Sequence, residues 1–317
     1  MKTKKLLQFP LKYFLIAVGV ILVVAIVIAS IFGFNTSVEF GGGTQFKIDV
    51  SNVSDIGSAR NNVIDVLENN NINVESSFIE DNQTSTYLVI RSTSKDISNL
   101  DQIKLAIAER LTADVSVVAQ VEPIKGSLSG NFMLMLGIGL LVAILIVFFA
   151  GWLRYKLIGG LTLALMMLGQ LLLYFALIAL TRIPLSSATL VAMVISIIIT
   201  LIISISIIEE ARSSVGTKQY EKLSEKEIIT ECATKVLNPL YFLGGMIILF
   251  CIVLLFVPNS FVQIFAVASI VGILSSVFIG LFMFSGLYIY LLELYNLNQT
   301  RRLSKNPNLV NKKVKEK

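Results

Sequence analysis

Residues 183–208 contain no charged side chain, and this uncharged run limits the possible folds more than any other feature of the sequence. A helix rises about 1.5 Å per residue, so a segment of this length crosses the ~30 Å hydrocarbon core of a membrane. Small and hydroxyl-bearing side chains recur at every fourth position: Ala188, Ala192, Ser196, Thr200 and Ser204. Such a stripe lets a second helix approach closely. We therefore expect a packing seam here; the alternative is an interface that moves or conducts.

Other uncharged runs indicate that the whole chain is a polytopic α-helical membrane protein. Of its 317 residues, 55% are hydrophobic and 15% are charged, whereas soluble domains have about 25% charged residues. Six transmembrane helices are predicted, at 13–34, 132–152, 157–180, 184–208, 239–257 and 261–292. The first is longer than the ~7–15-residue apolar core of a signal peptide, so we expect a retained anchor.

The distribution of Lys and Arg predicts the orientation. Eighteen of these residues lie in the segments that share one side of the membrane, which are 1–12, 153–156, the amphipathic connection 209–238 and the basic tail 293–317. The short loops on the other side hold only Arg182. Because Lys and Arg accumulate on the cytoplasmic side, both termini are expected in the cytoplasm and 35–131 outside the plasma membrane.

The extracytoplasmic segment 35–131 is predicted to fold as a small α+β domain. It carries 13 acidic and 7 basic residues. Alternating and β-branched residues indicate four strands, and apolar stripes of helical period indicate two helices. The strands are expected at 44–50, 73–79, 86–91 and 113–121, with helices at 56–67 and 100–111. This βαββαβ order is the ferredoxin-like pattern, here inserted between the first and second transmembrane helices.

A run of three glycines joins the first span to this domain. The motif consists of Val38, Glu39, Phe40, Gly41, Gly42, Gly43 and Thr44. Glycines permit positive φ and close approach of backbones. The motif is therefore either a flexible linker or a hinge whose ends are anchored in neighbouring structure. Pro123 and Gly126 lie in a second short neck at 121–126, before the second span.

Two further groups are candidate functional positions. Glu209, Glu210 and Arg212 follow the fourth span and are expected at its cytoplasmic end. The sixth span contains a second seam for helix packing, formed by Ala268, Gly272, Ser276 and Gly280. The basic tail is suited to contact with the lipid bilayer, and no specific nucleic acid is expected as a partner.

The residue inventory argues against catalysis. Histidine is absent, which excludes His-based triads and His metal ligands. Cys232 and Cys251 do not have the spacing of a metal or disulfide motif. Glu209 and Glu210 are adjacent, so on a helix their side chains diverge by ~100° instead of sharing a face. We expect no catalytic residue, no metal site and no cofactor, and therefore no enzyme.

Two motifs, in this order and topology, resemble the SecD/SecF family of protein-export subunits, on its SecF side. Ser37–Thr44 (SVEFGGGT) is similar to the family's G-I-D-F-T-G-G-T after the first span, and Ile208–Arg212 (IEEAR) resembles its F-D-R-I-R-E after the fourth. Residues 121–126 match V-G-P-x-V-G more weakly. The resemblance implies an accessory subunit of the Sec preprotein translocase. Its partners would be a SecD-like subunit, the SecYEG channel and preproteins, and it would form one half of a resistance-nodulation-division type unit.

The sequence departs from this family at the positions that the family uses for proton coupling. The intramembrane aspartate of the fourth span aligns with Ile203, the His-Asp pair of the third with Gly169 and Gln170, and the arginine of the fifth with Asn238. The polar residues present in the spans are Gln170, Ser196, Thr200, Ser204 and Asn238. These side chains form hydrogen bonds but do not titrate near neutral pH. We predict that this chain does not carry the proton-coupling site.

Two other functions remain open at this point. One is a half-transporter of the resistance-nodulation-division type that moves lipid or small amphiphiles. That function needs an apolar pocket and, for proton drive, an intramembrane charge. The other is a receptor or scaffold whose extracytoplasmic domain binds peptide at the edge of its sheet.

Overall fold

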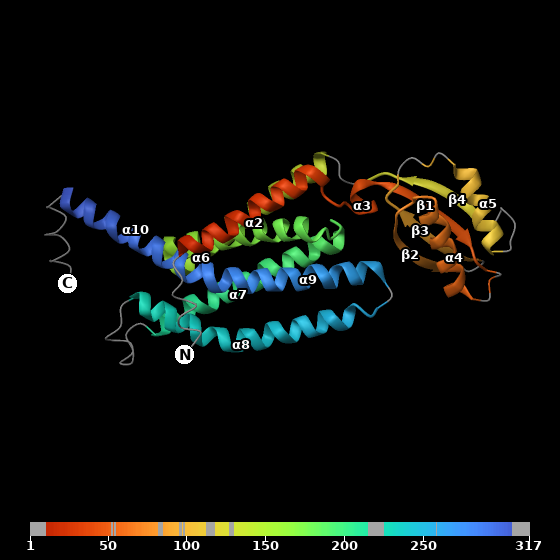
Figure 1. The fold of residues 1–317 in the computed structure, drawn as a ribbon. Helices are drawn as coiled ribbons and strands as arrows, with labels where there is room; N and C mark the ends of the chain where they lie inside the picture. The colour runs from red at the N-terminus through yellow and green to blue at the C-terminus, as the bar shows by residue number, and fades with distance from the viewer. Residues whose placement is uncertain are drawn as a thin grey trace.

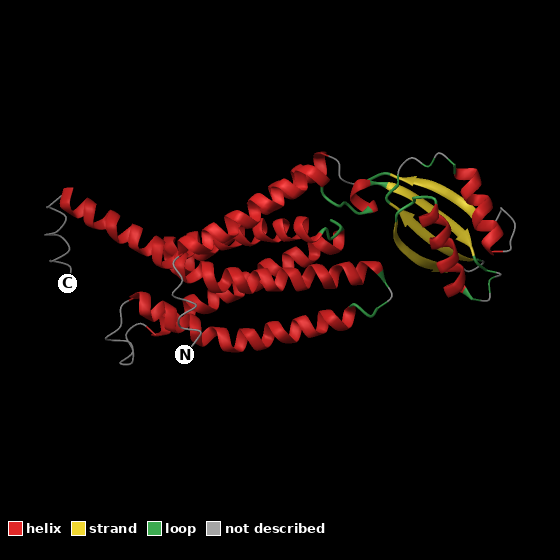
Figure 2. Ribbon diagram, viewed as in Figure 1, coloured by secondary structure: helices red, strands yellow, loops and turns green. Residues whose placement is uncertain are grey.

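The computed structural model describes residues 11–305 except 52, 54, 82–84, 95–96, 98, 112–117, 127–129, 215–224 and 258. A bundle of long helices and a small sheet domain lie end to end (Figure 1). Every strand among the described residues belongs to the sheet domain, and the described part of the bundle consists of helices and the loops that connect them (Figure 2).

The bundle consists of helices rich in Leu, Ile, Val and Phe. They are α2 (Leu11–Phe32), α6 (Gly130–Thr181), α7 (Ser187–Ser214), α8 (Glu225–Leu254), α9 (Ser260–Phe278) and α10 (Phe284–Lys305). Within the described chain, five of them are long and apolar enough to cross a membrane, namely α2, α6, α7, α8 and α9. The structure is therefore that of a multi-pass membrane protein.

Helix α6 is a hairpin of two helical arms. The backbone leaves the helical conformation at Tyr155 and Lys156, and Lys156 has φ 63°. Beside this turn, a Cβ atom placed on Gly151 would lie 2.8 Å from the Cα of Gly160, so the two arms touch through glycines. The arms correspond to the predicted spans 132–152 and 157–180, and the turn lies at the connection predicted between them.

Helices α7 and α8 extend into the predicted connection 209–238. Helix α7 continues to Ser214 and α8 begins at Glu225, so that only 215–224, which lies outside the described residues, separates them. Ile228 and Cys232 are buried against Ala211 of α7, which explains why the first turns of α8 are ordered against the bundle. Pro239, predicted to open the fifth span, lies inside α8 instead.

The sixth predicted span, 261–292, is divided in two. Helix α9 is followed by one π-helical turn, Ile279–Met283, and then by α10. A π-helical turn accommodates an extra residue and rotates the faces of the helix beyond it. Helix α10 continues to Lys305, so a part of the predicted tail 293–317 is helical, and 306–317 lie outside the described residues.

The sheet domain has the predicted order of elements. It contains β1 (Gly43–Asp49), α4 (Ile56–Asn69), β2 (Val74–Asp81), β3 (Thr86–Ser92), α5 (Leu100–Leu111) and β4 (Val118–Ile124). The four strands form one antiparallel sheet in the order β2-β3-β1-β4. Residues 113–117 of the last predicted strand lie outside the described residues.

One face of this sheet is covered by α4 and α5 (Figure 2). Alternate strand residues point to this face and meet the apolar stripes of the two helices. The resulting core contains Phe46, Ile48, Leu88 and Ile90 from the strands, and Val63, Leu67, Ile103 and Ile107 from the helices. Asp55 begins α4 as its N-cap, because its carboxylate accepts from Gly57 N at 2.9 Å and Ser58 N at 3.2 Å.

Candidate functional site

The sheet domain and the bundle are connected at a junction. It is formed by residues 32–43, by residues 124–126 of the second neck, and by the loop 182–186 with the first residue of α7. Leu185 bonds to the chain that leaves α2 on both sides: its N–H donates to Asn35 O at 2.8 Å, and its carbonyl accepts from Ser37 N at 3.1 Å. Arg182 donates to Gly33 O at 2.6 Å, and Asn35 Nδ2 donates to Arg182 O at 2.9 Å. The loop before α7 therefore holds the chain that enters the sheet domain.

Glu39 of the glycine motif bonds to the first residue of α7. Its Oε2 accepts from Ser187 N at 3.2 Å and from Ser187 Oγ at 2.7 Å. A carboxylate at this position satisfies an unpaired N–H and complements the positive end of the helix dipole. Glu39 itself lies in the four-residue helix α3 (Val38–Gly41), in which Val38 and Phe40 are buried. The end of the motif that precedes the glycines is thus anchored in neighbouring structure.

The glycines serve close approach between the two necks. Gly42 has φ 76°, and a Cβ atom on it would lie 2.8 Å from Gly126 N. A Cβ atom on Gly126 would lie 2.3 Å from Phe40 O. Gly43 is the first residue of β1, and a Cβ atom on it would lie 2.0 Å from Ser92 O. The chain entering the domain and the chain leaving it therefore cross in contact. This geometry does not fit the alternative of a loose linker, and motion about the crossing stays a prediction.

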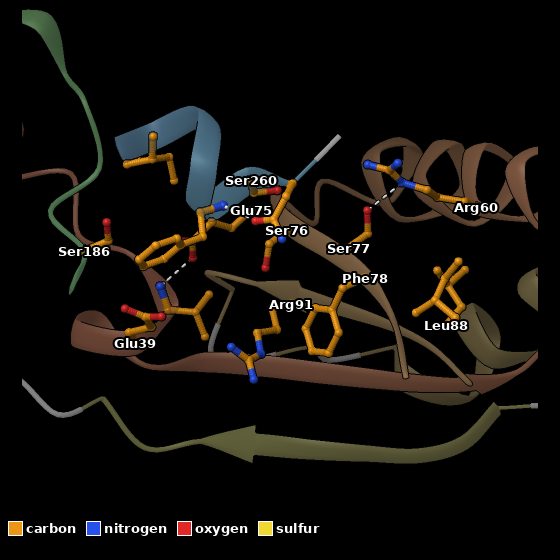
Figure 3. Close-up of a pocket in the computed structure, with 15 residues that line it drawn as sticks. Glu39, Arg60, Glu75, Ser76, Ser77, Phe78, Leu88, Arg91, Ser186 and Ser260 are labelled. Carbon is orange, nitrogen blue, oxygen red and sulfur yellow. Dashed lines mark hydrogen bonds between the residues drawn. The ribbon is translucent and has the colours of Figure 1, made fainter. Parts of the chain in front are cut away.

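Glu75 of β2 contacts the first residue of the glycine motif, Val38, and was not identified as a site residue from the sequence. Its carboxylate accepts a hydrogen bond from Val38 N (Figure 3). Burial raises the pKa of the Glu75 carboxyl above its ordinary value, and the charge of Glu39 adds to that effect; the bond from Val38 and the charge of Arg91 oppose it. The contact joins residues 37 positions apart, and no local pattern in the sequence indicates such a pairing.

A cleft of about 540 Å³ opens between the sheet domain and the bundle (Figure 3). Residues 75–79 of β2 form one side of it, and residues 259–261 and 264, around the start of α9, form another. Arg60 and Arg91 also line the cleft. Arg60 Nε donates to Ser77 Oγ at 2.6 Å, and the Arg91 guanidinium lies 5.1 Å from the centre of the Phe78 ring.

Inside the bundle, the two predicted seams face each other. A Cβ atom on Gly272 of α9 would lie 2.9 Å from Ser196 Cβ, and one on Gly280 would lie 2.6 Å from Ile203 Cγ2. Ser276 Oγ donates to Ser196 O at 2.7 Å, which joins α9 to α7. Thus α7 approaches both α9 and the π-helical turn that follows it closely.

The remaining hydroxyls of the α7 seam bond within their own helix. Thr200 Oγ1 donates to Ser196 O at 3.0 Å, and Ser204 Oγ donates to Thr200 O at 2.8 Å. Ser196, Thr200 and Ser204 are all buried. Bonds of this kind satisfy a buried hydroxyl without joining helices. The seam therefore acts mainly through small size, and its polar atoms do not form a relay across the bundle.

Gln170 lies against α9 and bonds to residues of that helix. Its side chain is fully buried, and Nε2 donates to Ser275 Oγ at 2.9 Å. Its Oε1 has no partner in the structure. Ile203, at the position of the family's aspartate, is buried against Gly280. Asn238 lies in α8, and its side chain is outside the described residues.

The residues that follow the fourth predicted span meet the turn of the α6 hairpin. Glu209 Oε1 accepts from Arg154 Nη2 and from Tyr155 OH, each at 2.8 Å, and Arg212 donates to Arg154 O at 3.0 Å. Glu210 points elsewhere and pairs with Lys235 of α8 at 3.4 Å. The two adjacent glutamates thus contact different helices, as their divergence on a helix predicts. Arg154 and Tyr155 were not identified as site residues from the sequence.

The described residues contain no group of three or more His, Cys, Asp or Glu that could hold a metal ion. Cys232 and Cys251 are both buried free thiols. The site consists of the hydrogen bonds that hold Glu39 to α7, the crossing of the two necks, and the cleft beside β2. This arrangement is suited to mechanical coupling between the sheet domain and the helix bundle.

The fold of this chain is similar to that of solved structures, although no family model and no curated protein matches the chain. Among solved structures it is similar to SecDF in a super-membrane-facing form, with a TM-score of 0.72 and 17% identity over 93% of this chain and 39% of that one. It is also similar to SecDF of Thermus thermophilus, described as a translocon-associated membrane protein, with a TM-score of 0.59 and 20% identity over 89% of this chain and 38% of that one. The chain thus spans about two fifths of the structures that it matches.

Proposed function

We propose that this chain is a SecF-like subunit of the protein-translocation machinery and assists the export of proteins across the plasma membrane. One observation carries the proposal: the helices and the sheet domain together share the fold of SecDF over almost the whole of this chain. The Ser37–Thr44 motif supports it, because these residues form the crossing and the anchor that connect the domain to the bundle.

In this proposal the bundle crosses the membrane six times, and the sheet domain is ferredoxin-like. The two arms of α6 count as separate spans because the chain reverses at Tyr155 and Lys156, and α9 continues through the π-helical turn into α10 as the sixth span. The distribution of Lys and Arg supports cytoplasmic termini and an extracytoplasmic sheet domain.

A SecD-like chain is the proposed partner. The solved SecDF chains hold the matched fold and a further portion of more than half their length. The channel SecYEG and preproteins are the other proposed partners. The apolar side chains exposed on α8, among them Phe242, Phe250 and Val253, supply surface for lipid or for a SecD-like subunit.

The proposal leaves proton coupling to the partner. Every buried polar side chain that the structure describes is uncharged. A proton relay needs groups whose charge changes within the membrane, whereas Gln170 and Ser204 are neutral and bonded to serine or backbone. We expect these two residues to contribute to packing only.

Purification from native membranes tests the proposal. The full chain, tagged and extracted in mild detergent, should recover a SecD-like chain and the channel, whereas an unrelated tagged membrane protein should recover neither. Recovery of the chain alone, together with transport of lipid or a small amphiphile in vesicles, would favour the half-transporter instead.

Reconstitution with the partner then tests the assignment of proton coupling. We expect Gln170→Ala and Ser204→Ala to leave proton-driven release of preprotein within about twofold of the unmodified protein. Thr162→Ala is the matched control, because Thr162 is also buried and bonds to its own helix. Loss of release in Gln170→Ala or Ser204→Ala, with assembly and the control intact, would place the coupling site in this chain.

A further inference from the structure

Strand β2 leaves one edge of the sheet without a partner. It pairs with β3 on one side, and no other described strand pairs with it. An edge strand presents a row of free backbone N–H and C=O groups, which proteins commonly protect with Pro or Lys. The opposite edge strand, β4, contains Pro123, whereas β2 has the sequence VESSFIED with neither Pro nor Lys. Strand β2 has an irregular register between Val74 and Ser76 and acidic residues at 75, 80 and 81, but residues 76–79 of its edge carry neither charge nor Pro. These central residues are the unprotected part of the β2 edge.

This edge borders the cleft. Five successive residues of β2, 75–79, line the cleft. Neighbouring residues of a strand point to opposite faces of the sheet, so an unbroken run can line one cleft only along the edge of the strand. The volume of about 540 Å³ falls within the range of ~300–1,000 Å³ that is usual for ligand pockets. The space lies between the β2 edge and the start of α9 (Figure 3).

The side chains along the edge define the chemistry of the occupant. Phe78 and Ile79 are 39% and 53% exposed and offer apolar contact. Glu39 and Glu75 place two carboxylates at the end near α3. Arg91 is held over the Phe78 ring, and Arg60 is bonded to Ser77. The segment 35–131 also carries more acidic than basic residues. The occupant should therefore be extended, partly apolar and basic.

We propose that the β2 edge binds an extended segment of polypeptide by strand addition within this cleft. Backbone N–H and C=O groups of the segment pair with β2. Apolar side chains of the segment pack on Phe78 at one face of the sheet and on Ile79 at the other, and a basic side chain faces Glu39 and Glu75. The inference rests on the proposed function, which brings unfolded polypeptide to the sheet domain, and it names the surface that receives it.

Binding of a short fluorescein-labelled peptide of alternating valine and lysine to the detergent-solubilised full chain tests the inference. N-methylation of alternate backbone amides should weaken binding at least about tenfold, because it removes the donors of a strand edge. Ile79→Lys should weaken binding about fivefold or more, since Lys on an edge strand opposes pairing. Leu105→Lys is the matched control on α5, where Leu105 is 51% exposed, and it should bind as the unmodified protein does.

Equal binding of the N-methylated peptide would overturn the inference, and so would an equal loss in Leu105→Lys. A peptide with glutamate in place of lysine should bind at least about fivefold more weakly, and equal binding would also count against it. Failure here, with the SecD-like chain still recovered on purification, would reject strand addition and leave the proposed function standing. Peptide binding without recovery of that partner would reject the proposed function.

Discussion

Gly126 lies where the two necks of the sheet domain cross, and a single methyl group there has no room. Its added Cβ would meet Phe40 O at 2.3 Å and Gly42 N at 2.5 Å, both backbone atoms that cannot rotate away. We expect Gly126→Ala to lower the free energy of unfolding by about 1–3 kcal/mol, the usual cost of overpacking.

Thermal unfolding of the detergent-solubilised chain, followed by circular dichroism, measures this effect. Gly139→Ala in α6 is the control, because no atom lies within 4 Å of its added Cβ and alanine favours the helix by up to about 1 kcal/mol. An unchanged melting temperature in Gly126→Ala would show that the necks separate readily and do not form a packed crossing.

Glu75 gives the junction a pH dependence of defined sign. Burial raises the pKa of its carboxyl above the ordinary value of 4.5, so the folded state disfavours the charged form. Its contribution to stability is complete below pH 4.5 and is lost as the pH rises through the raised pKa. Glutamine stays neutral and can still accept from Val38 N. The melting temperature of Glu75→Gln, relative to the unmodified protein, should therefore increase between pH 4.5 and neutral pH.

The same difference measured for Glu68→Gln, an exposed position on α4, provides the comparison. A Glu75→Gln difference that does not change with pH would mean that the Glu75 carboxylate is well solvated in the folded protein. The bond to Val38 would then contribute equally at every pH.

At the scale of elements, the approach of α7 to the π-helical turn that follows α9 depends on a pair of one small and one large side chain. Gly280 meets Ile203, and the added Cβ would lie 2.6 Å from Ile203 Cγ2. We expect Gly280→Ala to cost about 1–3 kcal/mol by overpacking and Ile203→Ala about 2–5 kcal/mol by leaving a cavity. In the double variant the alanine at 280 occupies part of that cavity, so the two costs should not add. A coupling energy of about 0.5–3 kcal/mol is expected.

Unfolding in denaturing detergent measures the four free energies of this cycle. A parallel cycle combines Ile203→Ala with Gly245→Ala on α8, where no atom lies within 4 Å of the added Cβ. In that control cycle the two costs should add within about 0.5 kcal/mol. Additive costs in the Gly280 cycle would indicate that the π-helical turn shifts away from α7 without loss of stability.

The elements also show which parts of the structure the sequence predicts. The order of strands and helices in the sheet domain follows from local periods, as in β1, where Phe46 and Ile48 alternate with half-buried neighbours. The seams follow from four-residue spacing. By contrast, α8 runs through Pro239 because its first turns pack on α7, and that contact is not encoded locally. The bond between Glu75 and Val38 and the orientation of Gln170 toward α9 also depend on tertiary packing alone.

At the scale of the whole molecule, the directions of the helices constrain the topology. Helix α2 begins and α10 ends at the end of the bundle that is far from the sheet domain (Figure 1). The α6 hairpin turns at that same end, since Arg154 and Tyr155 contact Glu209 there, while Arg182 at its other end contacts Gly33 beside the sheet domain. An even number of crossings, six in our proposal, places both ends of the bundle's chain on one side of the membrane.

Labelling of single cysteines tests this topology. In a background with Cys232 and Cys251 replaced by alanine, Ile79→Cys places a thiol in the sheet domain, and Leu153→Cys places one at the α6 turn, where Leu153 is 88% exposed. A membrane-impermeant maleimide should label Ile79→Cys in intact cells and Leu153→Cys only after permeabilisation. The reverse pattern would place the sheet domain in the cytosol. Labelling of both Ile79→Cys and Leu153→Cys in intact cells would mean that the two arms of α6 do not each cross the membrane. The α6 turn and the sheet domain lie on opposite sides only if each arm makes a full crossing.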